Sequence, residues 1–239
     1  MVYQAFINSI MTAQINGQLP DLSQAVVLET ELDKVQAWLE QRKGKFTASE
    51  FYRLMRFEDK DTFPDGAMTY VTEKVLEIVT TNESKQLSTR SVEWGKETEV
   101  EAVEKFVEQY GLEVYNYGDN QQYVELTKDV GCTPDGLIGK DFGIETKCPD
   151  SKNHLYYLEN LTIENFKKEC KDYYWQIQGS MYITGRKSWF FISYDPRFKK
   201  DDKRLFVLRI ERNEIDIAKL EKRLLEAIRR KNQKLKAFE

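Results

Sequence analysis

The sequence has few of the side chains on which many catalytic and metal sites depend. Its 239 residues include a single histidine, His154, which argues against a Ser-His-Asp triad and a two-histidine metal site. The three cysteines form no CxxC pair, which argues against a disulfide framework, a four-cysteine zinc site and an iron–sulfur cluster. We expect His154 at the surface or in a pocket, and the cysteines in the core. Catalysis would then rest on carboxylates, lysines, tyrosines or backbone groups, and carboxylates working without histidine usually hold a hard cation such as Mg²⁺.

Long apolar runs and a net positive charge are also absent. No run approaches the roughly 18 apolar residues of a membrane span, so we expect no membrane contact. Lys and Arg number 36 against 40 Asp and Glu, which gives a net charge of −4. That balance excludes a uniformly basic DNA-coating protein but leaves room for a local basic patch. No lysine or arginine precedes Lys34 and no signal-peptide pattern is present, so we expect a cytoplasmic protein.

What the sequence does contain is a pattern of helices, then strands, then helices. Apolar periodicity and chain breakers predict helices at residues 31–42, 47–55, 70–79, 88–110, 155–184 and 213–235. They predict strands at residues 113–117, 121–126, 132–138, 143–148, 187–194 and 205–210. This order favours an α/β fold with a central mixed β-sheet flanked by helices. We expect residues 1–30 to form an arm or helix whose role no motif defines, and residues 31–239 to form a single domain.

The most informative segment is a hairpin that turns at residues 139–142. If the turn is centred on Lys140, residues whose numbers add up to 280 face each other, so Asp135 lies opposite Glu145, with Cβ atoms ~5 Å apart. Glu145 and Lys147 share a face because side chains alternate along a strand. Two facing carboxylates with a lysine beside them suit metal-assisted hydrolysis of a phosphodiester. Spacing alone leaves an exposed, charged hairpin face as an equal alternative.

A long predicted helix places one carboxylate on its apolar side. On a helical wheel Val103 and Phe106 mark the core face, and Glu99 falls near the middle of that face. A buried carboxylate is unfavourable unless it meets a cation, a proton or a metal. We interpret Glu99 as a third acidic residue beside Asp135 and Glu145. A buried ion pair or a protonated Glu99 is the alternative.

A second cluster has the features of an anion pocket. Thr47 begins the short predicted helix with capping-box spacing, and Ser49 lies in its first turn. Free backbone N–H groups and a hydroxyl at that position can bind a phosphate, and Arg42 and Lys43 lie just upstream. An ordinary capped helix with solvated basic residues is the alternative.

Five collinear segments resemble those of one nuclease family. They are Arg42 with Thr47-Ala48-Ser49-Glu50, Trp94-Gly95-Lys96 with Glu99, Cys132 to Leu137, Gly143 to Pro149, and Gln176 to Ser180 leading into Trp189 to Arg197. Asp135 followed by Glu145-Thr146-Lys147 fits the PD-(D/E)xK nuclease motif. The set, spread over roughly residues 35–230, resembles the phage lambda exonuclease and YqaJ-like viral recombinase family.

The resemblance implies a PD-(D/E)xK restriction-endonuclease-like core and an Mg²⁺-dependent exonuclease. Such an enzyme digests one strand of linear double-stranded DNA from the 5′ end to mononucleotides. It leaves 3′ single-stranded tails for recombination by strand annealing. The resemblance also implies two Mg²⁺ ions per active site, replaceable by Mn²⁺, a homotrimer and a single-strand annealing protein as partner. If the gene is phage-borne, the location is the cytoplasm of a bacterial host.

The resemblance also implies a role for each site residue. Asp135, Glu145 and the Thr146 backbone carbonyl are metal ligands, and Glu99 holds a second metal or its water. Lys147 positions the nucleophilic water. The residues implied for the 5′-phosphate pocket are Arg42, Ser49, Thr133 and Gln176.

Two other functions remain open from the residues alone. One is a PD-(D/E)xK endonuclease, which has no use for a 5′-phosphate pocket. The other is a catalytically silent DNA-binding module that keeps the fold. Basic clusters at residues 186–187, 197–204 and 229–236 are candidates for contact with the DNA backbone, with solvated faces as the alternative.

Overall fold

The computed structural model describes residues 36–81 and 89–238, and the chain divides into two units, Met1–Gln41 and Arg42–Glu239. In the first unit the described residues 36–41 are helical, in agreement with that part of the predicted helix at 31–42. The predicted arm at residues 1–30 lies outside the described residues. The second unit carries all the elements described below.

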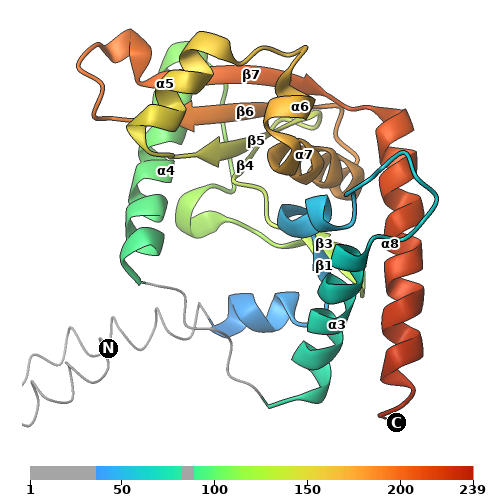
Figure 1. The fold of residues 1–239 in the computed structure, drawn as a ribbon. Coiled ribbons are helices and arrows are strands. Elements are labelled where there is room, and N and C mark those ends of the chain that lie inside the picture. The colour runs from blue at the N-terminus through green and yellow to red at the C-terminus, as the bar shows by residue number, and fades with distance from the viewer. Residues whose placement is uncertain (1–35, 82–88, 239) are drawn as a thin grey trace, which may run out of the picture. The chain divides into compact units, whose positions relative to one another are not determined.

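The second unit is built from helices and two β-sheets (Figure 1). Its helical elements are η1 (Ala48–Arg53), α3 (Asp65–Val79), α4 (Thr89–Tyr110), η2 (Gly118–Asn120), α5 (Ser151–Asn160), α6 (Phe166–Glu169), α7 (Lys171–Thr184), η3 (Asp201–Lys203) and α8 (Glu214–Leu235). Its strands are β1 (Phe46–Thr47), β2 (Val124–Thr127), β3 (Val130–Cys132), β4 (Gly136–Ile138), β5 (Phe142–Lys147), β6 (Ser188–Tyr194) and β7 (Leu205–Glu211).

The larger sheet is mixed and has the order β4-β5-β6-β7. The pairs β4–β5 and β6–β7 are antiparallel, and β5–β6 is parallel. In the β4–β5 hairpin Gly136 pairs with Ile144 and Ile138 pairs with Phe142, which confirms the predicted register. The smaller sheet has the order β1-β3-β2.

The larger sheet is covered on both faces by helices. Ile192 packs in one apolar cluster with α4 residues Val103 and Phe106. The preceding residue, Phe191, packs in the other cluster with Trp175 of α7. Because consecutive strand residues point to opposite faces, α4 and α7 lie on opposite sides of the sheet. The arrangement is the predicted mixed sheet flanked by helices.

Several predicted elements differ in detail. The single strand predicted at 132–138 is divided into β3 and β4, which belong to different sheets, because Pro134 lacks the N–H that a continuous strand needs. The strand predicted at 113–117 is reduced to one bridge between Tyr115 and Leu137. The helix predicted from Thr47 is a 3-10 helix, and the Thr47 side chain makes no capping hydrogen bond. The helical region predicted at 155–184 is three helices, α5 to α7.

Candidate active site

The link between the two sheets carries residues of both predicted clusters. Thr133, Pro134 and Asp135 connect β3 of the smaller sheet to β4 of the larger one. Thr133 therefore lies at the end of a strand paired with β1, and Asp135 lies at the start of the β4–β5 hairpin. The predicted phosphate pocket and the predicted carboxylate cluster meet at this three-residue link.

Asp135, Glu145 and Lys147 come together at the end of that hairpin. Asp135 Oδ2 accepts a hydrogen bond from the backbone N–H of Thr146, with an N–O distance of 2.7 Å. Lys147 Nζ donates to Glu145 Oε1 at 2.6 Å. The Glu145 side chain is 1% exposed, so this carboxylate does not lie on a solvated hairpin face. The exposed-face alternative is wrong for Glu145.

The electrostatics of this cluster reflect crowded negative charge. Burial, and then the neighbouring Glu145 and Glu99, raise the pKa of Asp135 well above its usual range. Burial by itself would lower the pKa of Lys147, but Glu145 and Asp135 outweigh it and raise that pKa. Lys147 is therefore a firmly charged ammonium beside two carboxylates.

Glu99 joins the cluster from α4. Beyond the effect of burial, its charge raises the pKa values of Asp135 and Cys148, so the carboxylate lies near the end of β5. Glu99 is half-buried, and its Oε1 accepts a hydrogen bond from Gln121 Nε2 at 2.6 Å. The prediction that Glu99 accompanies Asp135 and Glu145 is therefore consistent with the geometry. Trp94, Gly95 and Lys96 of the same helix lie outside the residues whose side chains the structure describes.

The donor atoms here suit a hard divalent cation. Two carboxylates and a backbone carbonyl at Thr146 offer only oxygen ligands, the type that Mg²⁺ prefers. A cation between Asp135 and Glu145 would offset the repulsion that raises the Asp135 pKa. Across the described residues no three or more His, Cys, Asp and Glu side chains form a ready-made metal cage. One oxygen each of Asp135 and Glu145 is engaged by Thr146 N and Lys147 instead.

The predicted phosphate pocket is partly assembled. Arg42 Nη1 donates to Thr133 Oγ1 at 2.6 Å, which joins two residues far apart in the sequence. Burial lowers the pKa of Arg42, but a guanidinium stays charged in any protein environment. Ser49 lies in the first turn of η1, with its Oγ 3.4 Å from Thr47 Oγ1. Arg42, Ser49 and Thr133 are all half-buried, so each keeps some access to solvent.

Gln176 reaches this region from α7. Lys147 Nζ lies 5.0 Å from the ring centroid of Tyr173, and the Ser180 hydroxyl hydrogen-bonds to the Cys132 sulfur. Gln176 is three residues after Tyr173 and four before Ser180, so it lies on the same helix face, between the two contacts. This places Gln176 between the carboxylate cluster and the Thr133 end of β3.

A close approach of two helices brings η1 to this face of α7. A Cβ at Gly179 would lie 2.3 Å from Phe51 Cδ2 and 3.5 Å from Ala48 Cβ. Only glycine lets η1 pack this tightly against α7. The contact sets where Ser49 lies relative to Gln176.

Sequence reasoning missed Gln121 and Tyr173. Gln121 falls within a stretch predicted as a strand, but it follows η2 and bonds to Glu99. Tyr173 looks like one more aromatic residue of an aromatic-rich helix, yet it faces Lys147. Neither residue has a local signal, because each role depends on a partner 22 or more positions away.

The sequence led us to expect His154 at the surface or in a pocket, and the structure does not place it at the surface. It is fully buried, with Nε2 2.9 Å from the Lys203 carbonyl oxygen and Nδ1 2.8 Å from Ser193 Oγ. A carbonyl only accepts, so Nε2 carries the proton and Nδ1 accepts from the serine. Burial lowers the pKa of His154. Cys132 and Cys170 are buried as expected, whereas Cys148 is half-buried, and all three thiols are free.

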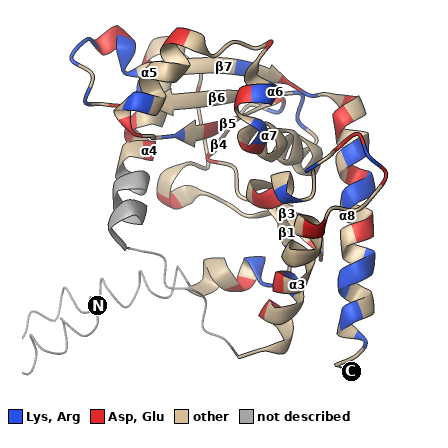
Figure 2. Cartoon of the chain, viewed as in Figure 1, with Lys and Arg blue, Asp and Glu red and all other residues tan. Residues whose placement is uncertain are grey.

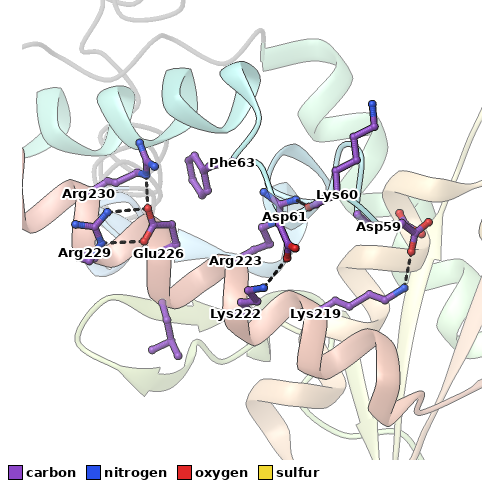
Figure 3. Close-up of a pocket in the computed structure, with 12 residues that line it drawn as sticks. Asp59, Lys60, Asp61, Phe63, Lys219, Lys222, Arg223, Glu226, Arg229 and Arg230 are labelled. Atoms are coloured by element: carbon purple, nitrogen blue, oxygen red, sulfur yellow. Dashed lines mark hydrogen bonds and ion pairs between the residues drawn. The ribbon is translucent and has the colours of Figure 1, made fainter.

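A charged groove lies away from this site, between α8 and the loop at residues 57–63 (Figure 3). Four of its cations are paired with carboxylates: Lys219 with Asp59, Lys222 with Asp61, and Arg229 and Arg230 with Glu226. Arg223 donates to backbone carbonyls of the loop instead. Figure 2 shows both signs of charge along α8. The basic cluster at 229–236 is therefore partly neutralised within the chain.

The family of the chain follows from comparison with known proteins. Residues 37–187 match the family described as the YqaJ-like viral recombinase domain. This match covers more than half of the chain, and the chain belongs to that family. The resemblance found in the five motifs is thereby confirmed. A protein of Escherichia coli (strain K12) named ExoD is 37% identical over 60 residues, which are 25% of this chain and 67% of that protein.

Solved structures confirm the fold class. An alkaline exonuclease, LHK-Exo from Laribacter hongkongensis, matches with a TM-score of 0.71 and 26% identity over 85% of this chain and 95% of that chain. The same protein in complex with dAMP matches equally well. A phage related exonuclease from Haemophilus somnus 129PT, at 18% identity and a TM-score of 0.64, covers 82% of this chain and 96% of that chain and shows the fold alone. Within the described part of the chain, no helix has both the length and the apolar character to cross a membrane.

Proposed function

We propose that this chain is a DNA exonuclease that hydrolyses phosphodiester bonds of linear double-stranded DNA. The observation that carries the proposal is the convergence of Asp135, Glu145 and Lys147 beside Glu99 at the sheet link. Membership of the YqaJ-like viral recombinase family and likeness to an alkaline exonuclease structure support it.

We assign the metal ligands to Asp135, Glu145 and the Thr146 carbonyl, with Glu99 holding a second ion or its water. Nucleases of this kind generally depend on a divalent metal, and the oxygen donors favour Mg²⁺, with Mn²⁺ as a substitute. When bound, the metal supplies charge stabilisation at the scissile phosphate. Lys147 donates to Glu145 and lies beside the assigned ligands, so we assign it to orienting the attacking water by hydrogen bonding.

We assign recognition of the DNA end to Arg42, Ser49, Thr133 and Gln176. The Arg42 guanidinium and the Thr133 hydroxyl, already in contact, offer donors to a terminal 5′-phosphate. Holding that phosphate beside the carboxylates gives digestion of one strand from its 5′ end, with release of mononucleotides. The 3′ single-stranded tail left behind is a substrate for recombination by strand annealing.

The wider setting is proposed from the family resemblance. It comprises a homotrimer, a single-strand annealing protein as partner, and a location in the cytoplasm, that of a bacterial host if the gene is phage-borne. The exonuclease domain would span residues 31–239. Light scattering coupled to gel filtration tests the trimer, and a monomer mass at assay concentration would refute it.

The activity is tested by a time course on linear duplex DNA with 5′-phosphate or 5′-hydroxyl ends, in Mg²⁺ or EDTA, with intact circular DNA included. We expect Mg²⁺-dependent release of mononucleotides, faster from 5′-phosphorylated ends, and an untouched circle. A nicked or linearised circle would favour the endonuclease. Absence of cleavage with salt-sensitive binding would favour the silent binding module.

Variants test the residue assignments in the same assay. Asp135→Asn, Glu145→Gln and Lys147→Met should each lower the cleavage rate by at least about 100-fold while DNA binding survives. Glu104→Gln is the matched control, because Glu104 is an exposed carboxylate on α4. Near-normal cleavage by any of the three site variants would refute that assignment. Arg42→Ala should slow digestion of 5′-phosphorylated ends selectively, and an equal loss on 5′-hydroxyl ends would contradict the pocket.

A further inference from the structure

Lys231 is a buried cation of α8 whose ammonium group contacts the segment that follows Arg42. Its Nζ donates to the Gly44 carbonyl oxygen at 2.6 Å and to Asp129 Oδ1 at 2.6 Å. The side chain is 3% exposed, and Nζ lies 5.6 Å from the ring centroid of Phe46. The ammonium group is thus engaged by a carbonyl, a carboxylate and an aromatic ring, all from segments at the smaller sheet.

The backbone of Gly44 is held from two sides. Its carbonyl accepts from Lys231 of α8, and its N–H donates to Glu77 Oε2 of α3 at 2.8 Å. Lys74 in turn donates to Glu77 Oε1 at 2.8 Å. Gly44 has φ +70°, and a Cβ there would lie 2.6 Å from Ile78 Cδ1, so the turn has little room to adjust. Two helices therefore fix the two peptide groups that flank Gly44.

The fixed turn leads directly to the predicted phosphate pocket. Lys45 N donates to the Arg42 carbonyl oxygen at 3.0 Å, which closes the turn behind the Arg42 side chain. Phe46 N donates to the Asp129 carbonyl oxygen at 2.8 Å, at the start of the β1–β3 pairing. Lys231 thus contacts the chain two residues after Arg42 and four residues before Thr133. These are the two residues joined by the 2.6 Å hydrogen bond.

We propose that Lys231 is a positioning residue that fixes Arg42 and Thr133 for recognition of a terminal 5′-phosphate. This inference rests on the proposed function. A buried ammonium is tolerated only when its donors are satisfied, and such a group favours one geometry of its partners. None of the contacts of Lys231 described above involves the carboxylate cluster. Its loss should therefore weaken discrimination between DNA ends more than hydrolysis itself.

Three variants isolate the role of Lys231. Lys231→Met keeps the apolar stem and removes the donors. A double variant, Lys231→Met with Asp129→Asn, avoids leaving a buried unpaired carboxylate and so guards against a failure to fold. Lys222→Met is the matched control, because Lys222 lies on the same helix and pairs with Asp61 at the surface, with the two side chains 74% and 96% exposed.

The first readout is the ratio of initial digestion rates on 5′-phosphate and 5′-hydroxyl ends. We expect this ratio to fall about tenfold in Lys231→Met and in the double variant, the size typical of losing a supporting contact behind a binding group. The rate on 5′-hydroxyl ends should change less than about twofold, and Lys222→Met should match the unsubstituted protein. An equal loss on both ends, or an unchanged ratio in a folded Lys231→Met protein, would overturn the proposal.

The second readout needs no nuclease activity. Amide hydrogen exchange of residues 42–47 in the free protein should be faster in Lys231→Met and unchanged in Lys222→Met. Faster exchange in a protein that does not distinguish the two ends would support the positioning contact and refute the phosphate pocket. Unchanged exchange would refute the positioning contact, whatever the activity.

Discussion

Single side chains decide the electrostatics of the candidate site. Glu145 is almost wholly buried, yet it keeps a charged partner in Lys147. Asp135 has a raised pKa because it is buried and because two other carboxylates lie near it. Gln121 is the neutral member of this group, and its amide holds one oxygen of Glu99. An amide that orients a carboxylate without changing its charge restricts the directions in which that carboxylate can serve as a ligand.

The contribution of Gln121 to cleavage can be measured with one variant and a matched control variant. Gln121→Ala removes the donor to Glu99 and should lower the cleavage rate by about 10-fold to 100-fold. Gln122→Ala is the control, because Gln122 is exposed and bonds to Asn116 rather than to Glu99. Initial rates at saturating Mg²⁺ and over a Mg²⁺ titration would be compared. Equal effects of the two variants would remove Gln121 from the site.

His154 predicts how stability depends on pH. Burial lowers its pKa in the folded state, so below the usual value of ~6.5 the unfolded chain takes up a proton that the folded protein does not. Stability from this residue is therefore present above pH ~6.5 and is lost as the pH falls, by up to about 1.4 kcal/mol per pH unit. Urea unfolding at pH 7.5 and 5.5 should show a larger loss for the unsubstituted protein than for His154→Gln. Because the chain has one histidine, an identical loss in both would contradict the expectation.

At the scale of elements, the sequence pattern correctly predicted those features that depend on residues close together in the chain. The β4–β5 hairpin has the predicted register because a short turn fixes which residues face each other. The strand predicted at 132–138 is divided because β3 pairs with Phe46–Thr47 in one sheet and β4 belongs to another. The alternation of apolar and polar residues within 132–138 gives no information about these distant partners. The predicted cluster of Asp135 and Glu145 therefore followed from the sequence. The joining of Arg42 to Thr133 came only from the resemblance, because it depends on the β1–β3 pairing.

The contact between η1 and α7 yields a paired prediction for two glycines. Gly179→Ala should destabilise the protein by about 1–3 kcal/mol, because its Cβ would lie 2.3 Å from Phe51 Cδ2 in a packed core. Gly66→Ala should stabilise it by roughly 0.5–1 kcal/mol, because Gly66 lies in α3 with no atom within 4 Å of the new Cβ. Urea unfolding of both variants checks the signs. Similar effects of the two substitutions would mean that α7 shifts freely away from η1.

Across the whole chain, basic residues nearly balance acidic ones, 36 against 40. A chain of net charge −4 that binds DNA must do so through local groups, and many cations of α8 already have carboxylate partners. Binding strength should therefore depend on a small number of phosphate contacts. Each contact that displaces a counterion contributes to the salt dependence of binding.

This balance gives a prediction for the salt dependence of DNA binding. In an Asp135→Asn background, which prevents cutting, the logarithm of the binding constant should fall linearly with the logarithm of salt concentration. Adding Arg42→Ala should reduce the steepness by about 1 on 5′-phosphorylated duplex DNA. On 5′-hydroxyl DNA the slope should not change. Fluorescence anisotropy titrations measure the slope on both DNA substrates. An equal change of slope on 5′-phosphorylated and 5′-hydroxyl DNA would mean that Arg42 contacts internal phosphates.

The short link through Pro134 has a consequence for product size. Thr133 and Asp135 are two residues apart, so their Cα atoms are separated by at most about 7 Å, and the proline ring restricts the backbone between them. The distance between Thr133 of the proposed 5′-phosphate pocket and Asp135 of the proposed metal site is therefore limited by covalent bonds. Most distances between functional residues in a protein are set by packing instead. A spacing fixed by covalent bonds stays the same when helices move or when surface residues are substituted. An enzyme built on it would release a fragment of the same length at every turnover.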